Sequence, residues 1–84
     1  TVALAAELSD KNILTNTVSP GFVNTDLTKK ILSAKEMKNL AQLVPIKRFA
    51  ETDEIVKLVM FLCSNENTYL SGQNIMIDGG FSIV

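Results

Sequence analysis

Hydrophobic and polar residues follow one another along this chain in blocks that predict both helices and strands. Residues 2–9 are strong helix formers and predict a helix. Residues 13–18 are rich in isoleucine, threonine and valine and predict a strand. Pro20 ends that strand, because proline cannot donate to a sheet ladder. Residues 27–43 carry apolar groups at helical spacing between lysines, which predicts one amphipathic helix or two short ones.

The second half of the chain holds its most apolar stretch. Residues 53–64 are apolar nearly all round, which predicts a buried helix. Thr52 is a good N-cap for this helix, and Asp53 and Glu54 occupy the first turn, where the helix dipole favours acidic groups. Residues 74–78 lie between glycines and predict a second strand.

The order of these elements predicts an α/β fold. A long helical crossover joins the two predicted strands, 13–18 and 74–78, and such a connection implies that they are parallel. Parallel strands occur almost only in sheets covered on both faces, and two of them cannot make a stable sheet. We therefore expect further strands to complete this sheet, and the chain, which lacks a starting methionine, to be part of a longer protein.

Composition limits the classes of function. The 84 residues allow one small domain, and 8 basic against 9 acidic residues give a net charge of −1 without an evident basic stripe, which argues against a nucleic-acid partner. Cys63 is the only cysteine and there is no histidine, so we expect no disulfide, no zinc site and a cytoplasmic setting, with Cys63 as an inert core thiol. The longest apolar run, residues 58–63, is too short to cross a membrane, and the first residues lack the basic region of a signal peptide.

The clearest chemical signal is the loop of residues 19–28, which follows the first strand. In open α/β sheets, ligands bind beyond the carboxyl ends of the strands. Pro20 would stiffen this loop, and Gly21 would let its backbone approach a flat ligand closely. Two interpretations remain open on the residues alone: a ligand-facing loop, or an ordinary strand-to-helix turn capped by Asn24-Thr25-Asp26.

Two stretches resemble one known family. "ILTNTVSPGFVNTDLT" is similar to the segment that follows the catalytic helix in the short-chain dehydrogenases/reductases, and in particular in 3-oxoacyl-carrier-protein reductases. "VPIKRFAETDEIVKLVMFLCSNENTYLSGQNIMIDGG" is similar to the same family's run to its last strand. The resemblance implies that residues 1–84 are the C-terminal portion of a Rossmann-like doubly wound parallel sheet, its last two strands and their helices, in a single NAD(P)-binding domain. It also implies a substrate loop at about residues 26–44.

The resemblance also assigns roles to individual residues. Pro20, Gly21, Phe22, Val23 and Thr25 match the family's cofactor-binding loop. There the Pro-Gly pair lies against the nicotinamide of NAD or NADP, the backbone at Val23 holds the carboxamide, and Thr25 reaches the carboxamide or the pyrophosphate.

Residues outside the loop receive structural roles. Asn16 matches a buried strand asparagine, and Arg48 an arginine that ties the substrate loop to acidic groups. Lys47 stands where the family commonly has glycine, so that turn is expected to differ. We expect Tyr69 to be a packing residue and Asp78 to cap the turn before Gly79-Gly80.

The catalytic groups of the family are not found in this sequence. It has neither a Gly-x-x-x-Gly-x-Gly loop nor a tyrosine four residues before a lysine, so no catalytic residue is assigned. The first hypothesis is therefore part of an NAD(P)-dependent oxidoreductase that transfers a hydride between nicotinamide and a small carbonyl or alcohol substrate. Its parent is expected to be a homodimer or homotetramer that assembles through the C-terminal strand and the apolar tail 81–84. The alternatives are a non-catalytic truncated fragment with a structural or oligomer-packing role, and an unrelated α/β binding module.

Overall fold

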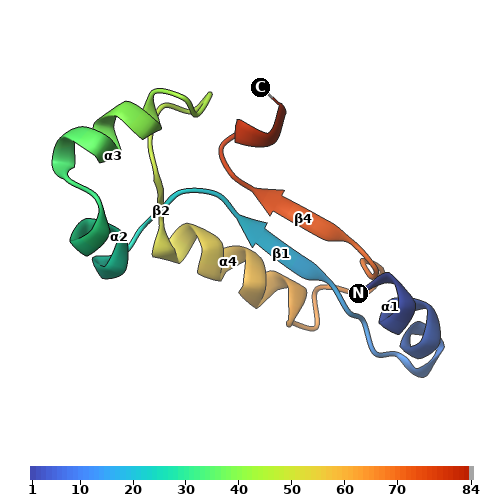
Figure 1. The fold of residues 1–84 in the computed structure, drawn as a ribbon. Helices are drawn as coiled ribbons and strands as arrows, with labels where there is room; N and C mark the ends of the chain where they lie inside the picture. Colours follow the sequence, from blue (N-terminus) through green and yellow to red (C-terminus); the bar gives the residue numbers. More distant parts are fainter. Residues whose placement is uncertain (84) are drawn as a thin grey trace.

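The helices and strands follow the predicted order along the chain. The computed structural model describes residues 1–83 (Figure 1). The predicted helical stretch 27–43 is two short helices, which decides between the two alternatives. The elements are α1 (Val2–Leu8), a 3₁₀ turn (Ser9–Lys11), β1 (Thr17–Pro20), β2 (Val23–Asn24), α2 (Asp26–Ile31), α3 (Ala34–Ala41), β3 (Ala50–Glu51), α4 (Thr52–Leu62), β4 (Asn74–Ile77) and a 3₁₀ turn (Phe81–Ile83).

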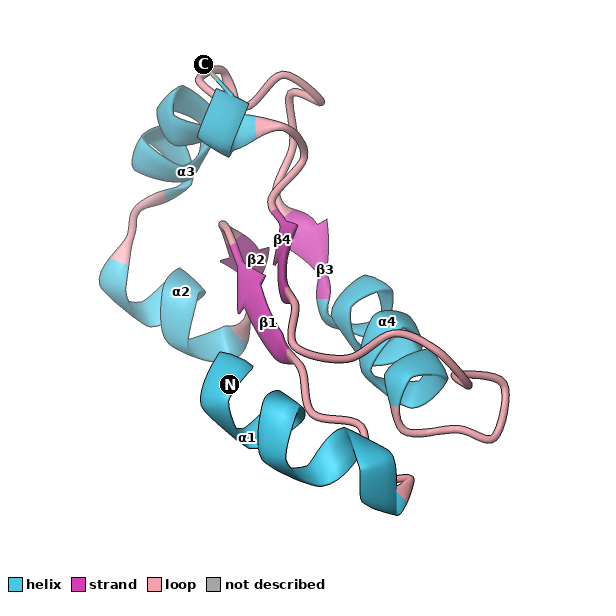
Figure 2. Cartoon of the chain, turned by 90° about the vertical axis from the view of Figure 1, so that its right-hand side faces the viewer, coloured by secondary structure: helices cyan, strands magenta, loops and turns pink. Residues whose placement is uncertain are grey.

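Strands β1 and β4 are paired in parallel, as the crossover length predicts. Their register runs from Thr17 opposite Asn74 to Pro20 opposite Ile77. Helix α4 lies along these strands, whereas α2 and α3 lie beyond the carboxyl end of β1 (Figures 1 and 2). Helix α4 thus forms a layer beside the strand pair, and the loop of residues 19–28 lies at the carboxyl end of the pair.

The limits of β1 differ from the prediction. The strand begins at Thr17 rather than residue 13, and Pro20 belongs to it instead of ending it. The N–H groups of Thr17 and Gly21 donate to the carbonyls of Gln73 and Ile77, at 2.8 and 3.1 Å. Successive residues of a strand turn their N–H groups to opposite edges, so Pro20 faces away from β4 and its missing donor costs no bond in this ladder.

Asn16 joins the segment before β1 to the segment before β4. Its side-chain amide donates to the Leu70 carbonyl at 2.9 Å, and its Oδ1 accepts from the Gln73 N–H at 3.1 Å. A single side chain thus replaces ladder bonds where the backbone is irregular. The structural role expected of Asn16 is confirmed.

The start of α4 also differs by one residue. Thr52 is the first helical residue, and Glu51 is the N-cap. The Glu51 N–H donates to Glu54 Oε1 at 2.9 Å, the reach-back bond of a capping box, and this moves the helix start one residue toward the N-terminus of the chain.

Very little of the chain is buried. The buried hydrophobic residues are Ala5, Val44 and Phe49, and α4 has no buried residue. The radius of gyration is 15.6 Å, against about 12 Å for a compact domain of this length. Two strands thus offer too little sheet to cover an apolar helix. None of the helices in residues 1–83 has the length and apolar character needed to cross a membrane.

Three expectations of burial are therefore wrong for this chain. Helix α4 was expected to be buried, but Met60 is 65% exposed. Cys63, expected in the core, is exposed, and Tyr69, expected to pack, is 98% exposed. These side chains lie on surfaces that no described element covers.

We predict that a synthetic peptide of residues 1–84 does not melt cooperatively and does not oxidise NAD(P)H. Leaving large apolar side chains of α4 uncovered forgoes about 1.5–3 kcal/mol each, against a typical domain stability of about 5–15 kcal/mol. Circular dichroism against temperature, with a reductase assay on the same sample, measures both properties. A sharp two-state transition together with turnover would contradict the prediction.

Candidate functional site

The loop after β1 is held by a second parallel pair. Strand β2 pairs with β3, with Val23 opposite Ala50 and Asn24 opposite Glu51. The pair brings together the two ends of the segment that contains α2 and α3. Sequence reasoning missed both strands, because two residues are too short to show a period.

The backbone of Val23 points away from this pair. The Ala50 N–H donates to the Phe22 carbonyl at 2.9 Å, so Phe22 faces β3, and Val23, the next residue, turns its N–H and carbonyl to the opposite side. There the Val23 carbonyl accepts from the Thr28 hydroxyl at 2.9 Å. The N–H of Val23 is therefore directed to the same side as α2.

Thr25 is the N-cap of α2, and its hydrogen bonds determine what else it can do. Its Oγ1 accepts from the Thr28 N–H at 3.1 Å and lies 2.9 Å from Thr28 Oγ1. Thr28 has one hydroxyl proton and gives it to Val23, so Thr25 donates its own proton to Thr28. One lone pair on Thr25 Oγ1 remains, and it can only accept. The capping interpretation of this turn is confirmed, and it leaves one position for a donor.

A groove of about 270 Å³ lies between this loop and α2. Three of the five predicted cofactor residues line it, Gly21, Phe22 and Val23. Pro20 and Thr25 do not line it: Pro20 ends β1 immediately before these residues, and Thr25 is hydrogen-bonded to Thr28, which does line the groove. The other lining residues are Leu27, Thr28, Ile31, Leu32 and Phe49, so the groove is largely apolar.

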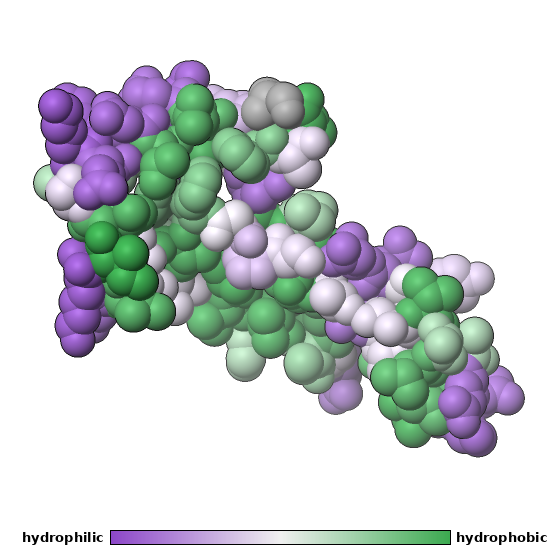
Figure 3. All heavy atoms as spheres, in the orientation of Figure 1, coloured by the Kyte–Doolittle hydropathy of each residue, from purple (hydrophilic) through white to green (hydrophobic). Residues whose placement is uncertain are grey.

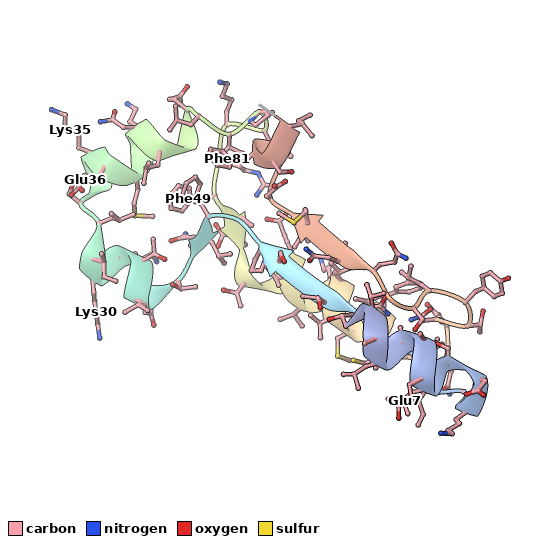
Figure 4. The ribbon with its side chains drawn as sticks, turned by 45° about the vertical axis from the view of Figure 1, so that its right-hand side comes forward. Glu7, Lys30, Lys35, Glu36, Phe49 and Phe81 are labelled. Atoms are coloured by element: carbon pink, nitrogen blue, oxygen red, sulfur yellow. The ribbon has the colours of Figure 1, made fainter. Side chains whose placement is uncertain are left out.

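The Phe22 side chain anchors the loop. Its ring stacks on Phe49 with centroids 5.2 Å apart and meets Phe81 edge-on at 5.3 Å. Along the chain Phe49 precedes β3 and Phe81 follows β4, and Figure 4 shows both near the loop that follows β1. Such aromatic pairs contribute about 0.5–1.5 kcal/mol beyond their buried area.

Gly21 is required where the loop crosses the end of β4. A Cβ atom at this position would lie 2.8 Å from Asp78 Cβ, closer than two carbons can approach. Asp78 in turn caps the next turn, accepting from the Gly80 N–H on Oδ1 and the Ser82 N–H on Oδ2, both at 3.0 Å. Loss of water around Asp78 raises its pKa, but the bonds from Ser82 and Gly80 outweigh this and lower it. The capping role expected of Asp78 is confirmed.

Arg48 lies at the end of the segment that follows α3, shortly before β3, and forms an ion pair there. Its guanidinium binds the Glu54 carboxylate through two bonds, at 2.7 and 2.9 Å. The bond to Arg48, followed by that from the Glu51 N–H, lowers the pKa of Glu54 to about 2. The same bond and the charge of Glu54 raise the pKa of Arg48. The role expected of Arg48 is confirmed.

Lys47 has a backbone conformation that favours glycine. Its φ is 65°, in the left-handed region that favours glycine. Its Nζ donates to the Gln42 carbonyl at 2.7 Å, a bond that glycine could not make. The turn was expected to differ from the family pattern, and in this structure it is a left-handed turn with a side-chain bond from Lys47.

We predict that Glu54 titrates near pH 2 and that Arg48→Met returns its pKa toward 4.5. Because the folded pKa is depressed, the pair stabilises the loop exit above about pH 4.5 and is lost as the pH falls toward 2. A ¹³C NMR titration of the Glu54 carboxyl measures this. Asp53, whose Lys57 partner is 3.5 Å away, is the control. Identical titration of Glu54 in both proteins would contradict the assignment.

The described residues that line the groove include no tyrosine that could act as a general acid. Tyr69 is the only tyrosine, it is fully open to solvent, and the residue four positions on is Gln73. Within residues 1–83 no three histidine, cysteine or acidic side chains gather as a metal site would need. The described residues therefore provide one side of the groove and the hydrogen-bonding groups beside it.

The described residues form an α/β unit with parallel strands and a loop at the carboxyl end of β1. A family profile described as "Enoyl-(Acyl carrier protein) reductase" matches residues 1–82. The chain belongs to this family of oxidoreductases, within the NAD(P)-dependent short-chain dehydrogenases/reductases.

Individual relatives agree with this assignment. The 3-oxoacyl-[acyl-carrier-protein] reductase FabG of Aquifex aeolicus is 39% identical over 80 residues, which are 95% of this chain and 32% of that protein. A short-chain dehydrogenase family protein of Francisella tularensis superposes with a TM-score of 0.90 at 34% identity, over 100% of this chain and 39% of that one. ElxO with NADP bound superposes with a TM-score of 0.90 at 28% identity, over 100% of this chain and 35% of that one.

The extent of these matches shows how much of each relative's length this chain corresponds to. It spans about a third of the length of the curated relatives it matches. The comparisons lend no support to the non-catalytic alternative. The parallel pairing of β1 with β4 argues against an unrelated binding module.

Proposed function

We propose that residues 1–84 are the C-terminal part of a single NAD(P)-binding domain, with a substrate loop at residues 26–44. The complete enzyme transfers a hydride between nicotinamide and a carbonyl or alcohol substrate. Matches over about a third of each relative's length support this placement. The pyrophosphate loop and the catalytic acid belong to parts of the domain outside these residues.

The observation that carries the proposal is the pair of groups left free beside the groove. The Val23 N–H faces away from β3 and can donate, and Thr25 Oγ1 retains one lone pair and can accept. A nicotinamide carboxamide has one carbonyl acceptor and one NH₂ donor, so it complements both groups. A pyrophosphate has acceptors only, and Thr25 has no proton left for it. Of the two contacts expected for Thr25, its hydrogen bonds therefore favour the carboxamide.

The residues of this chain then orient and enclose the reacting ring. The bound nicotinamide supplies or accepts the hydride. The Gly21–Val23 backbone forms one wall, fixed by the Phe22 ring stack and by the close contact with Asp78. The apolar side chains of α2 limit water on the substrate side.

We assign a 3-oxoacyl thioester as substrate. The Aquifex aeolicus relative is named as a 3-oxoacyl-[acyl-carrier-protein] reductase, and the groove beside the loop is lined by aliphatic side chains of α2 that suit an acyl chain. The enzyme assembles as a homodimer or homotetramer through β4 and the tail. Ile83 of that tail is exposed, and Val84 lies outside the described residues.

We predict that Thr25→Ala in the complete enzyme weakens NAD(P)H binding by about 1 kcal/mol, the net value of one hydrogen bond. Thr25→Ser keeps both the cap and the lone pair and is the matched control. Cofactor dissociation constants from fluorescence titration, with hydride transfer to a 3-oxoacyl thioester, test the proposal. Unchanged affinity in Thr25→Ala, or no turnover by the wild type, would refute it.

We predict that amides in residues 26–44 exchange hydrogen faster than those in 53–64 in the complete enzyme. Helices α2 and α3 are short, with six and eight residues, whereas α4 has eleven residues and an apolar surface for the completed sheet to cover. Hydrogen exchange followed by mass spectrometry, with and without cofactor, gives the ranking. Slower exchange in 26–44 would exclude a mobile substrate loop.

A further inference from the structure

Two apolar side chains of the tail, Phe81 and Ile83, lie in one 3₁₀ turn but have different surroundings. Ile83 is 84% exposed, whereas Phe81 is 38% exposed. Figure 3 shows hydrophobic surface at the upper end of the molecule, where Figure 1 places the turn after β4. The whole tail was expected to serve subunit assembly. Phe81, however, is partly covered by its own chain, so it has a contact that assembly does not explain.

That contact is with Phe22, in the loop that follows β1. The two rings meet edge-on, with their centroids 5.3 Å apart and their planes at 70°. Phe49 stacks on the same Phe22 ring at 5.2 Å and is itself only 8% exposed. Phe22 therefore contacts one ring that belongs to the small core and one that belongs to the tail.

These two rings determine how firmly Phe22 is held. Among residues 1–83, no further aromatic ring pairs with it. A cavity of about 130 Å³ also borders Phe22, and neither Phe49 nor Phe81 lines it. A side chain that borders a cavity forgoes packing contacts on that side. The orientation of Phe22 thus depends on its two aromatic contacts, and loss of either leaves space for the ring to move.

The turn that carries Phe81 is itself held by hydrogen bonds. The Asp78 carboxylate accepts from the Gly80 and Ser82 N–H groups, which precede and follow Phe81, both at 3.0 Å. The Asp78 carbonyl accepts from the Phe81 N–H at 3.2 Å. The backbone of Phe81 is therefore fixed from both sides, so its ring can act as a support for the loop.

We propose that Phe81 is a positioning residue for the nicotinamide, acting through Phe22 on the backbone of Val23. The inference rests on the proposed function and adds a residue of the tail to those that determine cofactor affinity. Asp78 limits the backbone at Gly21, and Phe81 contacts the ring of the next residue, so one turn meets two consecutive residues of the loop.

The path from Phe81 to the cofactor is short. Val23 directly follows Phe22, so a shift of Phe22 also moves the Val23 N–H, which is the proposed donor to the carboxamide. Small errors in the placement of a reacting group lower both affinity and rate. Phe81 does not line the groove beside the loop, so its effect on the cofactor is indirect.

The test compares two ligands of the complete enzyme: NAD(P)H, and the same nucleotide without its nicotinamide, which is ADP-ribose or its 2′-phosphate. We expect Phe81→Leu to weaken NAD(P)H binding about two- to tenfold, the range that corresponds to one aromatic pair. Its affinity for the nicotinamide-free nucleotide should not change, which also shows that the variant is folded. Phe81→Tyr keeps the ring and should bind both ligands as the wild type does. Ile83→Ala, in the same turn, is the matched control.

A double-mutant cycle with Phe22→Leu tests whether Phe81 acts through Phe22. Once Phe22 is leucine, Phe81→Leu should cost little further affinity, because the contact between the rings is already lost. Sedimentation velocity on the same samples records subunit assembly.

Four results would overturn the inference about Phe81. They are unchanged NAD(P)H affinity in Phe81→Leu, equal weakening of both ligands, an equal effect of Ile83→Ala, and additive effects of the two leucine substitutions. A loss of affinity that appears only together with loss of assembly would also overturn it. A wild-type enzyme that does not bind NAD(P)H would instead overturn the proposed function.

Discussion

The parallel pairing of β1 with β4 is the constraint on which the site depends. It pairs residues that are 57 positions apart in the sequence and places the carboxyl ends of the two strands, Pro20 and Ile77, side by side at one edge. The loop after β1 then crosses the turn after β4 so closely that only glycine fits at position 21. Asp78 holds that turn through two backbone bonds. The position of the loop backbone therefore follows from the ladder and from steric contact, and it does not require a bound ligand.

A second set of contacts fixes the two ends of the proposed substrate loop, residues 26–44, and leaves the helices between them without such contacts. The β2–β3 pair, the Phe22–Phe49 stack and the Arg48–Glu54 pair all lie where residues 26–44 leave and rejoin the strands. Helices α2 and α3 beyond them bury no residue. Stability is thus concentrated at the ends of the segment, which suits a loop that moves over a substrate and returns to one place.

The order and type of most helices and strands could be predicted from the sequence, whereas the burial of individual side chains could not. Proline and glycine mark the end of β1 because their backbone restrictions are local. The start of the strand depends on where β4 begins, which no local pattern records. The β2–β3 pair has too few residues to show a period. Met60, Cys63 and Tyr69 carry the apolar character of buried positions, but exposure depends on what lies beside them. The resemblance supplied the cofactor residues, and the structure adds the hydrogen-bond direction at Thr25 that the residue names could not give.

Thr25 links the proposed cofactor contact to the order of the substrate loop. The same Oγ1 atom that has a lone pair free also caps the first turn of α2 and donates to Thr28, which donates to the Val23 carbonyl. A donor bound to that lone pair would strengthen the other bonds of the chain by polarisation. The Val23 N–H, the other proposed contact, belongs to the residue whose carbonyl ends this chain of bonds. A carboxamide that engages both groups would therefore stabilise the start of the proposed substrate loop, so cofactor binding and loop order would favour each other.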